Sequence, residues 1–205
     1  MTPFSTLTEY QHDVLTETIN IGFGRAAASL SVLVNQKVVL DVPQISVLSI
    51  NDLSSAMNSM YSDLAAVEQQ FSGGIQGDVV LIMDLDIASV FIDLLSGGPG
   101  ISRPLTFSDR EALLEVGNIL LNAYIGSFGN LMKTQVNVSV PMLHMHSLDK
   151  LFAGIRDEGN SPFVLLVKTK FLLNNGSVVG HVALIIESYS LDSLFLSLQV
   201  VSLSE

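Results

Sequence analysis

Two groups of residues, placed at the same spacing in the two halves of the chain, have side chains with which this protein could do chemistry. They consist of Glu17, Asn20 and Pro43, and of Glu115, Asn118 and Pro141. Both follow the pattern E-x2-N-x22-P, and they lie 98 residues apart. One Glu–Asn pair is typical of a solvated helix surface. Its recurrence at the same distance from a proline indicates an internal duplication that has kept a site.

The chemistry open to such a pair is narrow. A carboxylate can bind a cation of a partner, and a carboxamide can hold a water molecule through its donor and acceptor atoms. Asparagine is no base near neutral pH, and the pattern supplies no nucleophile, no second acid and no set of metal ligands. We therefore expect each pair to complete the active site of another protein.

Two long helices are predicted to position the pairs. Residues 8–34 and 108–132 have apolar and small residues at spacings of three and four, which predicts one packed stripe along each helix. In each helix the Glu and the Asn share a second stripe, apart from the packed one. Thr8 begins a capping-box pattern, and so does Ser108, whose partner would be Glu111.

The two copies differ beside the pairs. Ile19 precedes Asn20, whereas Gly117 precedes Asn118. A β-branched residue next to the asparagine would narrow the approach of a partner's backbone. We therefore predict that replacing Asn118 by alanine costs more activity than replacing Asn20. Asn122, one turn after Asn118, is expected to be merely solvated.

Small residues are concentrated in the middle of the first helix, between Gly22 and Ala28. They do not form a phosphate-binding loop, because no strand precedes them. We predict that they let the two long helices pack closely.

A proline interrupts the β-branched stretch that follows each helix, at residues 37–50 and 135–146. Proline lacks an N–H and fixes φ, so inside a strand it indicates a sheet edge or a bulge. We expect Pro43 and Pro141 to shape the strand beside the helix and not to contact phosphate.

The remaining elements repeat in the same order. Short helices are predicted at 51–58, 86–95, 148–155 and 191–198, and strands at 77–84, 162–173 and 178–186, while the mixed composition of 63–71 does not fix its type. Two repeats, about 8–98 and 106–200, are joined by the Gly/Pro-rich linker 97–104. Neither repeat has enough strands for a sheet of its own. We therefore predict one domain over 1–205 with an α+β fold (an α/β sandwich), in which both long helices pack on a shared, pseudo-two-fold sheet.

Composition narrows the range of partners. Nine Lys and Arg against twenty Asp and Glu give a net charge of −11, which disfavours nucleic acid. The chain has no Cys, its apolar runs are far shorter than the roughly 18 residues of a membrane span, and its start lacks the pattern of a signal peptide. We therefore expect a cytoplasmic protein without a membrane span. His144 and His146 alternate along a strand without further ligands, so no metal site is predicted.

The doubled motif resembles that of the CheC family of chemotaxis phosphatases, which includes CheC, CheX and FliY. The family pattern is approximately [D/S]-x3-E-x2-N-x22-P, and the first copy matches it fully, beginning at Asp13. The second copy has Glu111 where the pattern has Asp or Ser. The resemblance covers nearly the whole chain, and the two motifs make it similar to stand-alone CheC.

This resemblance implies a function. Such proteins hydrolyse the aspartyl phosphate of the response regulator CheY. Glu17 and Glu115 are then expected to pair with the regulator's active-site lysine, and Asn20 and Asn118 to orient a water for in-line attack. The Mg²⁺ at the phosphoryl group would belong to the regulator, and this chain would need no cofactor of its own. Asp13 and Glu111 would flank the partner-binding surface.

Three alternatives remain open at this stage. The chain could be a non-enzymatic adaptor that binds a response regulator or the deamidase CheD, or a dimeric phosphatase like CheX. A flagellar-switch component of the FliY type is disfavoured, because the sequence ends soon after the second repeat. The sequence does not decide whether both sites are active or which oligomer forms.

Overall fold

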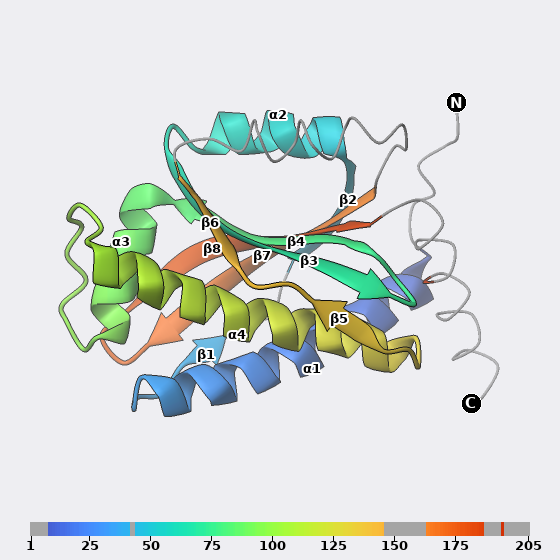
Figure 1. Ribbon diagram of the computed structural model, residues 1–205, viewed down its shortest axis with the longest axis horizontal. Coiled ribbons are helices and arrows are strands. Elements are labelled where there is room, and N and C mark those ends of the chain that lie inside the picture. The colour runs from blue at the N-terminus through green and yellow to red at the C-terminus, as the bar shows by residue number, and fades with distance from the viewer. Residues whose placement is uncertain (1–7, 42–43, 146–162, 187–193, 195–205) are drawn as a thin grey trace.

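An antiparallel sheet with helices on both faces forms the centre of the computed structural model (Figure 1), which describes residues 8–41, 44–145, 163–186 and 194. In chain order the described elements are α1 (Glu9–Leu33), β1 (Val39–Leu40), β2 (Gln44–Ser49), α2 (Ile50–Met60), β3 (Leu64–Gly73), β4 (Gly77–Asp84), α3 (Leu85–Leu95), α4 (Phe107–Leu131), β5 (Val136–Val138), β6 (Met142–Met145), β7 (Phe163–Leu173) and β8 (Gly176–Ile186). Residues 63–71, whose type the sequence left undecided, lie largely in β3. The predicted helices at 148–155 and 191–198 fall outside the described residues, apart from Leu194.

The strand order shows how the two halves of the chain share the sheet. Strands β4 and β8 pair at its centre, and β3 and β7 flank them. The edge strands β1 and β2 of the first half pair with β7, whereas β5 and β6 of the second half pair with β3. Exchanging the halves leaves this order unchanged, so the predicted α+β fold with one shared sheet is confirmed. The boundaries of the repeats remain a prediction.

Alternation along the strands divides the apolar side chains between two cores. Ala65, Val67 and Phe71 of β3 face the layer of α1, α3 and α4, as the period of two predicts. Leu64 and Ala66 point to the opposite face, where α2 packs. Figure 1 shows α2 on one side of the sheet and the two long helices on the other. Within the described part of the chain, no helix combines the length and apolar character that crossing a membrane requires.

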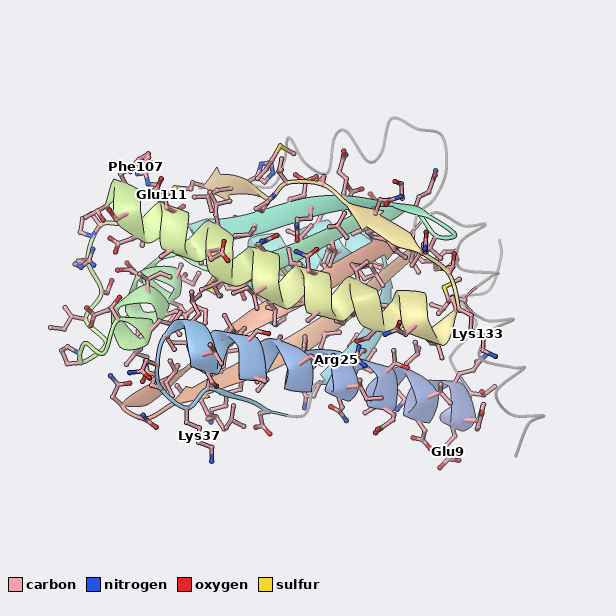
Figure 2. All side chains as sticks on the ribbon, turned by 60° about the horizontal axis from the view of Figure 1, so that its bottom comes forward. Glu9, Arg25, Lys37, Phe107, Glu111 and Lys133 are labelled. Carbon is pink, nitrogen blue, oxygen red and sulfur yellow. The ribbon has the colours of Figure 1, made fainter. Side chains whose placement is uncertain are left out.

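The two long helices lie antiparallel and side by side, since α1 begins near the end of α4, as Figure 2 shows. Their contact is built around the rings of Phe23 and Tyr124, whose centroids are 5.7 Å apart. A Cβ on Gly22 would lie 2.7 Å from Ser127 Oγ, so glycine allows this approach. The predicted close packing is therefore confirmed at Gly22. Gly24, by contrast, has nothing within 4 Å of such a Cβ.

The starts of the long helices test the predicted caps. Thr8 caps α1 in a capping box with Gln11, as predicted. For α4 the prediction of Ser108 with Glu111 is wrong, because Thr106 and Asp109 form the box. The deciding interaction comes from the linker, where both terminal nitrogens of Arg103 bind the Asp109 carboxylate at 2.5 and 3.0 Å. The hydrogen bond from Arg103 holds the pKa of Asp109 well below its usual range.

Candidate functional site

The helices present the two Glu–Asn pairs in the same way. Glu17 and Glu115 are exposed, while Asn20 and Asn118, one turn further along, are half-buried. Each pair therefore has a carboxylate in solvent and a carboxamide partly enclosed by its surroundings. Asp13 and Glu111, one turn before each glutamate, are exposed as well.

Pro141 lies in a bulge at the edge of the sheet. Val138 pairs with Phe71 and Met142 pairs with Glu68, so three residues of this edge stand opposite two residues of β3. The extra residue bends the edge and leaves Val140 80% exposed. A proline is compatible with this position because its missing N–H takes no ladder bond. The expected bulge is thus present at Pro141.

The register of the first copy has the same spacing. Leu40 pairs with Phe171 and Gln44 with Lys168, so the number of residues between the two pairs is again three on one side and two on the other. Pro43 lies outside the described residues, and its expected role stays a prediction. The backbone N–H of Asp41 donates to Lys170 O at 2.9 Å, just as that of Ser139 donates to Gln70 O at 2.8 Å in the second copy.

The bulge of the second copy connects to Asn118 through Gln69, a residue that the sequence did not single out. Gln69 is 1% exposed and faces the helix layer. Its Nε2 donates to the backbone carbonyl of Ser139 at 2.9 Å and to Asn118 Oδ1 at 3.1 Å. Asn122 Nδ2 donates to the same Oδ1 at 2.7 Å, so the expectation that Asn122 is merely solvated is wrong.

The first copy lacks both of these donors. Thr169 takes the register position of Gln69, and Gly24 takes the helix position of Asn122. The Thr169 hydroxyl is buried and has no hydrogen-bond partner in the part of the chain that the structure describes. Among the described residues, the Asn20 side chain has no hydrogen bond. The two copies thus share a backbone frame but hold their asparagines differently.

The proposed effect of Ile19 and Gly117 on the approach of a partner is wrong. Ile19 is fully buried in the core under α1. Gly117 also points inward, since a Cβ there would lie 2.5 Å from Val67 Cγ1. Both positions therefore face the core between the long helices and the sheet. Neither residue shapes the outer surface.

Glu115 lines an apolar hollow of about 310 Å³ between α1, α3 and α4. The other lining residues are Leu33, Val34, Ile92, Leu95, Ser96, Ala112 and Val116. Leu33 is 51% exposed at the rim. A partner that offers a cation to Glu115 would therefore find apolar surface beside it.

The two sites are too far apart to act on one group. Gly22 contacts Ser127, which fixes the register of the antiparallel helices. Asn20 and Asn118 are then offset by roughly 15 Å along the helix axes, at 1.5 Å per residue. The described residues contain no group of three or more His, Cys, Asp and Glu side chains suited to a metal ion. His144 instead pairs with the buried Glu68 at 2.5 Å.

The chain is similar to two curated proteins of Bacillus subtilis (strain 168). It is 32% identical over 162 residues to the CheY-P phosphatase CheC, which covers 78% of this chain and 76% of that protein. It is 26% identical over 175 residues to the flagellar motor switch phosphatase FliY, covering 84% of this chain and 45% of FliY. No family model matches the chain.

Solved structures show the same fold. Thermotoga maritima FliY superposes with a TM-score of 0.76 at 20% identity, over 95% of this chain and 98% of that one. FliM in the FliM–SpeE complex from H. pylori gives a TM-score of 0.67 at 11% identity, over 95% and 97% of the two chains. The chain therefore shares its fold with FliY and FliM at low sequence identity.

Proposed function

The chain belongs to the CheC family of chemotaxis phosphatases, and we propose that it hydrolyses the aspartyl phosphate of a CheY-type response regulator. The observation that carries the proposal is the repeated pair, with an exposed Glu one turn before a half-buried Asn on both long helices. This arrangement offers a charge for docking and an amide for positioning.

Each pair would act by completing the regulator's active site. Glu17 or Glu115 would pair with the regulator's lysine, and Asn20 or Asn118 would orient a water in line with the phosphorus–oxygen bond. The Mg²⁺ that neutralises the phosphoryl oxygens would be bound by the regulator. Phosphoryl transfer passes through a loose transition state, so positioning and charge supply most of the catalysis.

Docking at the second site would use the apolar hollow beside Glu115. A regulator surface that places an apolar side chain next to its lysine fits this surface, because burying the apolar group adds affinity to an exposed ion pair worth at most about 1 kcal/mol. This feature supports a protein partner over a small phosphate ester.

The decay of the phosphorylated regulator tests the proposal. We expect the unchanged protein to accelerate decay, each single variant Asn20→Ala and Asn118→Ala to retain part of that acceleration, and the double variant to lose about 100-fold. Asn130→Ala, at an exposed position outside both motifs on α4, is the matched control and should behave like the unchanged protein. A double variant as active as the unchanged protein would show that these residues do not form the sites.

The same experiment separates the phosphatase from an adaptor. Complex formation with the regulator and an unaltered phosphate lifetime would identify an adaptor. Binding of CheD stays a prediction, and a pull-down with purified CheD would measure it.

A further inference from the structure

The amide of Gln69 can take only one orientation in its buried position. A backbone carbonyl accepts hydrogen bonds and donates none. The bond to Ser139 O therefore requires the Nε2 end of Gln69 to face the bulge. The same nitrogen reaches Asn118 Oδ1. Among the described residues, Gln69 Oε1 is buried without a hydrogen-bond partner, so the donor end is the one that the fold uses.

This orientation fixes Asn118 in turn. Its Oδ1 accepts from Gln69 Nε2 and from Asn122 Nδ2, which occupies both lone pairs of the oxygen. The Nδ2 of Asn118 is then the end left to act on a ligand. Asn118 presents hydrogen-bond donors, which can hold the oxygen of a water molecule or of a phosphoryl group.

The bulge sets the donor-to-acceptor direction of these hydrogen bonds. Ser139 O can accept from Gln69 because the three-against-two register turns the edge strand away from its ladder at this point. The backbone N–H of Gln70 donates to Ser139 Oγ at 2.9 Å, which ties the bulge to β3. The bulge, Gln69 and Asn118 form one connected unit.

We propose that Gln69 is a positioning residue that holds the Asn118 amide with its N–H₂ toward the partner, and that the second site is therefore the faster of the two. The inference rests on the proposed phosphatase function. It attributes the expected difference in rate between the two sites to the residue at the matching register position, which is Gln69 in β3 for the second site and Thr169 in β7 for the first. The residue before each asparagine is not the cause.

The test uses variants in which one site acts alone. In an Asn20→Ala background only the second site remains, and Gln69→Leu should lower its kcat by about 10-fold to 100-fold with little change in KM. Gln69→Glu has nearly the same shape, but its carboxyl group offers at most one donor where Gln69 Nε2 supplies two, so it should also lower kcat. In an Asn118→Ala background, where the first site acts alone, the same Gln69 substitutions should leave kcat unchanged.

Asn122→Ala gives a second variant that leaves no buried hole, because Asn122 is exposed. It removes one of the two donors to Asn118 Oδ1 and should lower kcat in the Asn20→Ala background, by less than Gln69→Leu does. It remains informative if a Gln69 variant fails to fold, which would appear as loss of the first site's activity as well.

The outcomes are distinguishable. An unchanged kcat for both Gln69→Leu and Asn122→Ala in the Asn20→Ala background overturns the inference but leaves the phosphatase intact. So does an Asn118→Ala protein that is more active than the Asn20→Ala protein. If neither asparagine substitution slows hydrolysis, the assignment of the sites fails, and the inference fails with it.

Discussion

The carboxylates of Glu111 and Glu115 lie one turn apart on α4, and both are exposed, but only Glu115 lines the apolar hollow. Glu115→Gln in the Asn20→Ala background should raise KM about threefold to fivefold with little change in kcat, since an exposed ion pair contributes up to about 1 kcal/mol. Steady-state hydrolysis of the phosphorylated regulator measures this effect.

Glu111→Gln is the matched control for that change, and we expect it to alter KM less. The difference between Glu115→Gln and the unchanged protein should shrink at high salt, because exposed charges are screened within about 10 Å at 0.1 M. An equal rise in KM for Glu111→Gln and Glu115→Gln would show that the partner responds to the net charge of the helix and not to Glu115 in particular.

Single residues differ in how far the sequence predicts them. The placement of Glu115 and Asn118 on one face of a long helix could be predicted, because the same local pattern occurs in both halves. Gln69 and Ser139 were not, since their contact with Asn118 depends on the register of a bulged edge strand against β3. A signal was nevertheless present. Aligning the halves at Phe71 and Phe171 matches Gln69 of β3 with Thr169 of β7. On the buried, helix-facing side of these two strands, this is the only matched pair of polar residues, and the two residues differ.

At the level of elements, the contact between the long helices predicts opposite effects on stability for Gly22 and Gly24, which lie in the same cluster of small residues in the sequence. Gly24→Ala should raise the free energy of unfolding by up to about 1 kcal/mol, since alanine favours the helix and meets no atom. Gly22→Ala should lower it by about 1–2 kcal/mol, because its Cβ would lie 2.7 Å from Ser127 Oγ and 3.1 Å from Ala123 O.

Urea denaturation of both variants beside the unchanged protein measures these opposite signs. A Gly22→Ala protein as stable as Gly24→Ala would mean that α1 and α4 can move apart without cost. Such a result would contradict the tight helix contact.

The start of α4 shows why local patterns misplace an element's end by two residues. Ser108 with Glu111 and Thr106 with Asp109 both offer a hydroxyl and a carboxylate at the spacing of a capping box. Arg103 decides between them, because its fork binds Asp109 and leaves Glu111 exposed. That contact comes from a linker whose path no helix pattern encodes.

At the level of the whole molecule, the sheet is predictable in outline but not in order. The count of strands in each repeat indicated a shared sheet, and strand alternation identified the faces. The exchange of edge strands could not be deduced, because it depends on which hairpin each short strand reaches. This exchange places the edge strands of each half beside a strand of the other half. The second site accordingly joins Gln69 of the first half to Asn118 of the second.

The exchange also predicts how the chain tolerates division within the linker 97–104. Residues 1–98 alone would leave β3 without its edge partners β5 and β6, and β4 without β8. Exposed strand edges of this kind favour aggregation. We therefore expect residues 1–98 and 106–205, expressed separately, to lack a cooperative thermal transition, and the two co-expressed fragments to purify as one complex that hydrolyses the phosphorylated regulator. Circular dichroism and co-purification through a tag on one fragment measure this, and a cooperative transition in either fragment alone would contradict the shared sheet as the unit of folding.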